Sequence, residues 1–207
     1  MNTSRTMSRE GQPTEFGPIA VGGMGGSGTR LIAQILEQLG YFLGGDFNRA
    51  QDNLWFTLLF KRSDILTVPD AEFDELVRLF QQRMTSPELI SQESIDMVKR
   101  LAENRRSQHT AAWLRSRAES FIDTRSASAR TKRWGWKEPN THVVLHRLRQ
   151  RLPAMRYIHV VRNGLDMAFS KNHNQLKTWG PHFLNGPIKV KPYYLLKYWC
   201  ALHLRVI

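Results

Sequence analysis

The feature that most constrains this chain is a glycine-rich stretch near its N-terminus, PIAVGGMGGSGTRLIAQILEQL at Pro18–Leu39. Ile19–Val21 is an apolar run typical of the end of a buried strand, and a helical apolar pattern begins after Ser27. The intervening glycines predict a loop with unusual dihedral angles or close backbone approach. Such a loop directs backbone N–H groups and the positive end of a helix dipole at one point. We therefore predict an anion site here, usually one for phosphate.

The loop differs from the nucleotide-binding motif GxxxxGK[ST] at one informative position. Counting from Gly23, Thr29 stands where the lysine should be, and Arg30 follows it. In nucleotide hydrolases that lysine contacts the outer phosphates, and the next hydroxyl holds magnesium. The reversed order argues against ordinary ATP or GTP hydrolysis. A P-loop kinase of small molecules stays open as an alternative.

The composition indicates one domain with a sizeable core, because the chain has 207 residues and an ordinary apolar fraction. We expect a leader at 1–16 and a single domain over 17–207. The lone Cys200 cannot form an intramolecular disulfide, which suits a reducing cytoplasm. No run of eighteen apolar residues is present, so we expect no membrane span and a cytoplasmic location.

The positive charge is concentrated between Lys99 and Arg156, where fifteen Lys and Arg residues stand against four acids. Such a basic zone implies an anionic partner. No recognised nucleic-acid motif accompanies it, and its aromatic residues are not spaced as a stacking platform. Nucleic acid is therefore the weaker alternative.

Strands that alternate with helices predict an α/β fold, with a parallel sheet flanked by helices. A second strand is expected at Tyr157–Val161, and the region 40–133 is expected to be helical. The helices that the apolar patterns predict lie at 48–60, 70–84, 87–105, 107–123, 141–151, 165–172 and 193–207.

A second strand-to-helix turn repeats the logic of the first. The strand at Tyr157–Val161 delivers Arg162 at its carboxyl end, where open α/β sheets place ligands. Ser170 follows eight residues later, so a cation and a hydroxyl could flank one oxyanion. Asp166 could pair with Arg162 or cap the helix. With the glycine loop, this turn favours a second phosphate site.

These motifs resemble the sulfotransferases that use 3′-phosphoadenosine 5′-phosphosulfate (PAPS). In that family a loop of the form [P]-[K/R]-S-G-T-[T/S] cradles the 5′-phosphosulfate, and a later R-x7-S binds the 3′-phosphate. Many bacterial and protein-modifying members carry W-G-x-K-x-P between them, and WGWKEP at 134–139 is similar. The resemblance implies that Lys137 faces the sulfuryl group and that Arg162 and Ser170 bind the 3′-phosphate. The implied 5′-phosphosulfate loop consists of Gly25, Gly26, Ser27, Gly28, Thr29 and Arg30.

The resemblance implies a P-loop NTPase-like sulfotransferase fold with a large helical insertion. It also implies in-line transfer of a sulfuryl group from PAPS to a hydroxyl or amine of a small-molecule or carbohydrate acceptor. The family's loop cation falls on Gly26 here, so we expect Arg30 to supply the charge from the next helical turn. Glu138 is our candidate general base, and Asp46 and Asp52 are further candidates.

Two further expectations qualify this assignment. Family members usually continue with another strand and a basic, glycine-containing segment over the 3′-phosphate, and the sequence ends at Ile207 without either. We therefore expect a C-terminally truncated member or an incomplete donor site, and a non-catalytic anion-binding protein stays an alternative.

His142 and His146 have the i, i+4 spacing of a metal pair but lack a third ligand, so no metal is expected. No signal for an oligomeric state is present.

Overall fold

The central element is a three-stranded parallel sheet, seen in a computed structural model that describes residues 17–104, 106, 108–123 and 133–206. The predicted leader lies outside these residues. The strands β1 (Ile19–Gly23), β2 (Gly135–Lys137) and β3 (Arg156–Val160) stand in the order β2-β1-β3. Strand β1 pairs with both neighbours in parallel. The predicted α/β class with a parallel sheet flanked by helices is thus confirmed.

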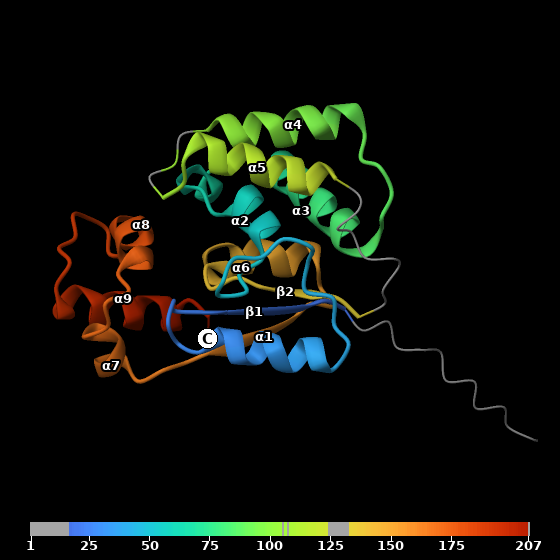
Figure 1. Ribbon diagram of the computed structural model, residues 1–207. Coiled ribbons are helices and arrows are strands. Elements are labelled where there is room, and N and C mark those ends of the chain that lie inside the picture. Colours follow the sequence, from blue (N-terminus) through green and yellow to red (C-terminus); the bar gives the residue numbers. More distant parts are fainter. Residues whose placement is uncertain (1–16, 105, 107, 124–132, 207) are drawn as a thin grey trace, which may run out of the picture.

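Helices cover both faces of this sheet (Figure 1). On one face α1 packs alone. On the other lie α6 and, above it, the helices α2 to α5. The helical elements are α1 (Thr29–Gln38), α2 (Leu54–Phe60), the short 3₁₀ helix η1 (Ser63–Leu66), α3 (Asp70–Thr85), α4 (Gln92–Glu103), α5 (Ala111–Ile122), α6 (Thr141–Arg151), α7 (Gly164–Ala168), α8 (Asn174–Phe183) and α9 (Pro192–Leu204).

The alternation of side chains along β1 divides the core in two. Val21 faces α1 and packs with Ala33 and Leu36 in a small apolar cluster. Ala20 faces the other way, into the main cluster beneath α2, α3 and α6. None of the helices in the described part of the chain is long and apolar enough to cross a membrane.

Aromatic packing fixes α2 over the end of β2. The ring of Phe56 stacks on Trp136 at a centroid distance of 5.8 Å, and Phe80 of α3 meets Trp136 edge-on at 5.3 Å. All three rings are buried, and such pairs are favoured beyond their area burial. Because Trp136 precedes Lys137, this packing also positions the lysine against the start of α2.

The predicted helix at 48–60 is wrong in its first half, since α2 begins only at Leu54. The Asn48 side chain accepts hydrogen bonds from the backbone N–H groups of Ala50 and Asp52, which makes a turn. Asn53 then caps α2 by accepting from the Phe56 N–H at 2.8 Å. Asparagine side chains compete in this way with helical hydrogen bonds. Asp52 therefore lies in a turn and not on a helix face.

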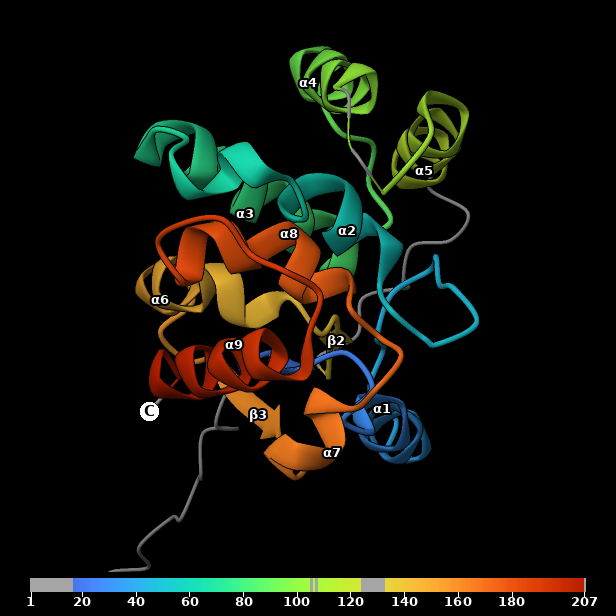
Figure 2. The same ribbon diagram turned by 90° about the vertical axis from the view of Figure 1, so that its left-hand side faces the viewer.

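Other predicted boundaries shift for related reasons. Ser91 and Thr110 act as N-caps, so α4 and α5 begin later than predicted. The helix predicted at 165–172 ends at Ala168, and α8 was not predicted at all. Helices α7, α8 and α9 gather at the end of the sheet where β1 leads into α1 (Figures 1 and 2). They place additional side chains around the glycine loop.

Candidate active site

The glycine loop lies at the carboxyl end of the central strand and leads into α1. Gly26 and Gly28 have φ angles of +97° and +104°, in the left-handed region that favours glycine. Gly28 is the N-cap of α1, and this helix start has no side-chain cap and no acidic residue in its first turn. The positive end of the α1 dipole is therefore open to an anion.

Unpaired donors collect at this helix start. The backbone N–H groups that donate to none of the described residues are those of Gly26, Gly28, Thr29 and Arg30. The hydroxyl oxygen of Ser27 is buried and also has no hydrogen-bond partner among them. Buried polar groups are rarely left unsatisfied, so this arrangement fits an oxyanion ligand.

Gln175 of α8 holds the loop in this shape. Its side-chain oxygen accepts from the Gly25 N–H at 3.1 Å, and its side-chain nitrogen donates to the Gly23 carbonyl at 3.2 Å. The residue is buried, and both ends of its amide bind the loop backbone. Gln175 thus fixes the loop while leaving the donors at the start of α1 free.

A second support comes from the segment that follows β2. The carbonyl of Pro139 accepts from the Gly23 N–H at 3.2 Å and lies 2.9 Å from Nδ1 of His142. The other ring nitrogen of His142 lies 3.3 Å from the Tyr198 hydroxyl. Burial lowers the pKa of His142 to about 3, so its ring is neutral. Nδ1–H donates to Pro139, and both ring nitrogens have protein partners. Among the described residues, no group of three His, Cys, Asp or Glu side chains could hold a metal ion.

The turn after β3 reaches the glycine loop. The exposed guanidinium of Arg162 donates from Nη1 to the Gly26 carbonyl at 3.4 Å and lies 3.5 Å from Asp166. The Ser170 hydroxyl accepts from the Asn172 N–H at 3.0 Å. The side chain of Asn172 lies so close to Gly25 that a Cβ there would approach it to 2.9 Å. Arg162 and Asn172 thus border the loop from the β3 side, and Ser170 holds the backbone at Asn172.

Lys137 ends β2 on the other side of the loop. It is only 2% exposed, and its ammonium binds the Asp52 carboxylate and the Ala50 carbonyl, the latter at 2.9 Å. The backbone carbonyl of Lys137 also accepts from the Asn53 N–H at 2.8 Å. The turn before α2 therefore closes over the lysine and neutralises its charge.

Glu138 points elsewhere and is fully buried. Both of its carboxylate oxygens accept from Asn140, one from the backbone N–H and one from the side chain at 2.8 Å. The ammonium of Lys61 lies 3.8 Å from Oε1. Burial raises the pKa of Glu138, while Lys61 opposes that shift. In this arrangement Glu138 organises the segment after β2 and does not face an open site.

The remaining candidates differ in their exposure and contacts. Asp46 is nearly buried, binds Arg117 at 2.6 Å through Oδ1, and leaves Oδ2 without a partner among the described residues. Arg30 lies in the first turn of α1, is exposed, and forms no ion pair with a described residue. Its position beside the free N–H groups suits a cation that completes the anion site.

The basic zone between Lys99 and Arg156 serves largely within the fold, as far as the structure describes it. Arg147 and Arg151 both bind Asp70 at 2.8 Å. Arg106 donates to carbonyl groups of α2, and Arg117 pairs with Asp46. The residues 124–132 of this zone lie outside the described part.

Sequence reasoning missed Gln175 and Asn140. No apolar periodicity marks α8 clearly, because Gly180 and Pro181 lie inside the helix and Gly186 follows soon after its end. Asn140 stands next to Glu138 and Pro139, where the motif WGWKEP could have drawn attention to it. Its side-chain oxygen accepts from the Trp179 ring N–H at 2.9 Å, so it connects the β2 segment to α8.

The structure is thus an α/β fold with a glycine loop at the carboxyl end of its central parallel strand, where Lys137 ends one neighbouring strand and Arg162 follows the other. The family model described as the sulfotransferase family matches residues 18–201, and the chain belongs to this family. Comparisons with curated proteins and with solved structures gave no match.

Proposed function

We propose that the protein transfers a sulfuryl group from PAPS to a hydroxyl or amine of a small-molecule or carbohydrate acceptor. The observation that carries this proposal is the open start of α1, with its unpaired N–H groups and the orphaned Ser27 hydroxyl. Lys137 ends β2 and Arg162 follows the end of β3, so both lie at the same edge of the sheet, on either side of β1. Membership of the sulfotransferase family supports sulfuryl transfer in general.

The two ends of the donor would take different parts of this edge. The N–H groups from Gly26 to Arg30 would hold the 5′-phosphate, because they converge at the positive end of α1. Arg162 and Ser170 would hold the 3′-phosphate. The guanidinium of Arg162 is exposed, and its contacts with Gly26 and Asp166 are long, so it is available for a stronger anionic partner.

The reaction needs charge stabilisation more than covalent catalysis. The acceptor oxygen or nitrogen attacks sulfur, the bond from sulfur to the 5′-phosphate oxygen breaks, and adenosine 3′,5′-bisphosphate leaves with the electron pair. Lys137 and Arg30 would neutralise the charge that develops on the transferring group and the leaving oxygen. The acceptor proton must go to a base within hydrogen-bond reach.

Asp52 is the acid best placed to take that proton. It is partly exposed and binds the ammonium of Lys137, which the family resemblance places at the sulfuryl group. When Lys137 turns to the donor, the Asp52 carboxylate becomes free beside the reacting centre. Glu138, which the sequence suggested, is enclosed and bound through both oxygens. We therefore assign Glu138 a positioning role and Asp52 the role of base.

Transfer of a radiolabelled sulfuryl group from PAPS to a panel of sugars, alcohols and phenols tests this function. We expect labelled product with the wild-type protein and none above background with Lys137→Met. The exposed Lys177 of α8, changed to methionine, is the matched control and should retain the activity. Phosphate transfer from ATP with magnesium in place of sulfuryl transfer would overturn the proposal in favour of a kinase. Binding of PAPS without transfer to any acceptor would instead support a non-catalytic anion-binding protein.

A further inference from the structure

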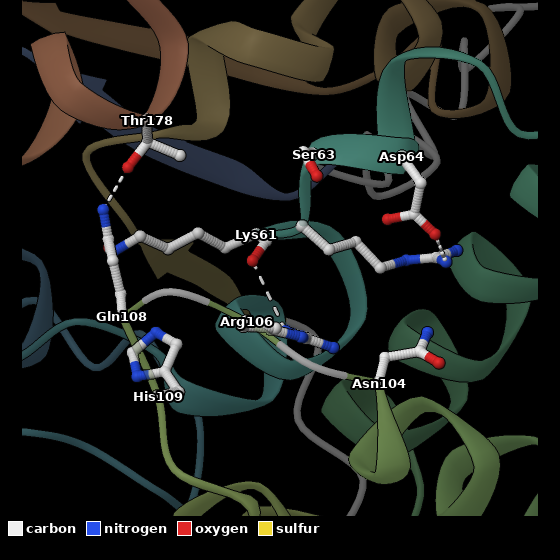
Figure 3. A pocket seen from close by; sticks show the side chains of 9 residues that line it. Lys61, Ser63, Asp64, Asn104, Arg106, Gln108, His109 and Thr178 are labelled. Carbon is white, nitrogen blue, oxygen red and sulfur yellow. Dashed lines mark hydrogen bonds and ion pairs between the residues drawn. The ribbon is translucent and has the colours of Figure 1, made fainter.

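A pocket of about 440 Å³ lies away from the glycine loop, between the C-terminal end of α2, the connection from α4 to α5, and α8 (Figure 3). We call it the α2–α8 pocket. Its volume is within the range of small-ligand sites. Its walls are polar, and no residue of the glycine loop lines it. The residues that line the pocket are Lys61, Arg62, Ser63, Asp64, Asn104, Arg106, Gln108, His109 and Thr178.

Positive charge exceeds negative charge in this pocket. The one carboxylate among the lining residues, Asp64, is bound by Arg62 at 2.6 Å. Arg106 donates to the carbonyls at the end of α2, with Nη2 2.6 Å from Leu58 O, and forms no ion pair with a described residue. Among the described residues, Lys61 pairs with the carboxylate of Glu138, which is 3.8 Å away and outside the lining. An anionic ligand would therefore meet Arg106, which has no carboxylate partner among these residues, and Lys61, whose contact with Glu138 is long.

Two hydrogen-bonding atoms in the pocket are also unsatisfied. Nε of Arg106 and Nε2 of His109 are buried and have no hydrogen-bond partner among the described residues. The ring of His109 is held in place by stacking on Trp113 at a centroid distance of 4.0 Å. Burial and the charges of Lys61 and Arg106 lower the pKa of His109 to about 4. A bound anion would reverse the electrostatic part of that shift.

The pocket is connected to the reacting centre through α2 and β2. Asp52 lies just before α2 and binds Lys137. Lys61 lies at the other end of α2 and contacts Glu138, which follows Lys137 in the chain. The seven residues of α2 span about 10 Å. A small acceptor could therefore place a charged group in the pocket and its reacting hydroxyl or amine near Lys137.

We propose that the α2–α8 pocket binds an oxyanion group of the acceptor, a carboxylate or a sulfate or phosphate ester. This inference rests on the proposed sulfuryl transfer and names the class of acceptor, an anionic small molecule. Lys61 and Arg106 supply charge, and Nε of Arg106 and Nε2 of His109, which have no partner among the described residues, donate hydrogen bonds to the same group. The donor occupies the glycine loop and leaves this pocket to the acceptor.

Histidine-ring NMR with inorganic phosphate as the probe tests the pocket directly. The loop is first saturated with adenosine 3′,5′-bisphosphate, ionic strength is held constant with sodium chloride, and the His109 signal is assigned with His109→Gln. We expect phosphate to raise the pKa of His109 by at least one unit, and Lys61→Gln to weaken this binding about tenfold. Lys177→Gln, outside the pocket, should have no effect. An unchanged His109 signal at saturating phosphate would overturn the pocket as an oxyanion site.

Thr178→Phe provides a second variant, because it fills the pocket without removing a charge or the contact of Lys61 with Glu138. It should abolish the effect of phosphate on His109.

The acceptor role is tested with a sugar and its uronic acid counterpart. Thr178→Phe should raise KM about tenfold for the acid and leave KM for the neutral sugar unchanged. Equal changes in KM for both would contradict the acceptor role. Failure of the bisphosphate to bind the loop would count against the proposed function, whereas the His109 response reports on the pocket alone.

Discussion

Lys137 at the end of β2 and Asp52 in the turn before α2 form a nearly buried ion pair, which joins the sheet to the helical layer. In the proposed function, the acceptor and the donor meet at this pair. The Asp52 carboxylate neutralises the lysine in the structure, and we propose that the sulfuryl oxygens replace it on the lysine and so release a base. This relationship links the fold to the proposed chemistry.

Asp52→Asn should therefore lower kcat by about 10²- to 10⁴-fold, the usual contribution of a positioned base. The affinity for adenosine 3′,5′-bisphosphate should stay within about threefold, because Asp52 does not belong to the loop. Steady-state kinetics and calorimetry measure the two quantities. Asp96→Asn on α4 serves as the control. A variant with normal kcat would transfer the role of base to Asp46, whose Oδ2 has no partner among the described residues.

Arg30→Ala should lower kcat strongly, by about 10²-fold or more, because a cation beside the developing charge is lost. The melting temperature should change little, since Arg30 is exposed and forms no ion pair with the described residues. Arg149→Ala, an exposed arginine of α6, is the control for a general loss of positive charge. Unchanged turnover in Arg30→Ala would remove Arg30 from the mechanism and leave the loop without a side-chain cation.

Gln175→Ala tests the support of the loop. Two buried hydrogen bonds to the loop backbone are lost, so the free energy of unfolding should fall by about 1–3 kcal/mol. Affinity for the donor should fall as well, because the loop amides lose their fixed arrangement. Urea denaturation and calorimetry give both values, with the exposed Gln34→Ala on α1 as the control. A stable variant with normal donor affinity would show that Gln175 does not organise the site.

The fold could be predicted in outline because its signals are local. Ile19–Val21, the glycines after it and the apolar stripe of α1 each follow from short-range physics, and so does the strand before Arg162. The prediction that a helix begins at 48 was wrong, because the side chains of Asn48 and Asn53 accept hydrogen bonds from nearby backbone N–H groups and so favour a turn and a helix cap. Periodicity alone does not register that competition.

The residues of the site that lie at the ends of strands could be predicted from the sequence. Lys137 ends β2 and Arg162 follows the end of β3, and parallel strands bring such residues to one edge. The role of Gln175 depends on a contact across 150 positions in the sequence, which no local pattern encodes. The enclosure of Glu138 likewise depends on Asn140 and Lys61, which only tertiary packing brings together.

The buried, neutral His142 gives the protein a defined pH response. Its pKa is lowered to about 3 in the folded chain, so between pH 6.5 and 3 the unfolded chain binds a proton that the folded chain does not. The free energy of unfolding should therefore fall as the pH falls through this window. His142→Gln removes this contribution and should make the loss between pH 7 and pH 5 smaller by about 2 kcal/mol.

Urea denaturation at the two pH values measures this difference, and the exposed His146→Gln on the same helix is the control. Comparison of variant with wild type cancels the contributions of other groups, including the raised pKa of Glu138. Identical pH dependence in wild type and His142→Gln would mean that folding does not lower the pKa of His142. Burial would then not keep the ring neutral below pH 6.5.

In the proposed function, the glycine loop and the β3 turn bind the two phosphate ends of PAPS. Calorimetric titration with adenosine 3′,5′-bisphosphate tests it most directly, on the wild type, on Arg162→Ala and on the control Lys177→Ala. We predict one-to-one binding by wild type and control, and binding weakened at least about tenfold in Arg162→Ala, as expected for the loss of a charge-assisted contact to phosphate. Absence of bisphosphate binding, or preferential binding of ATP with magnesium, would contradict the account.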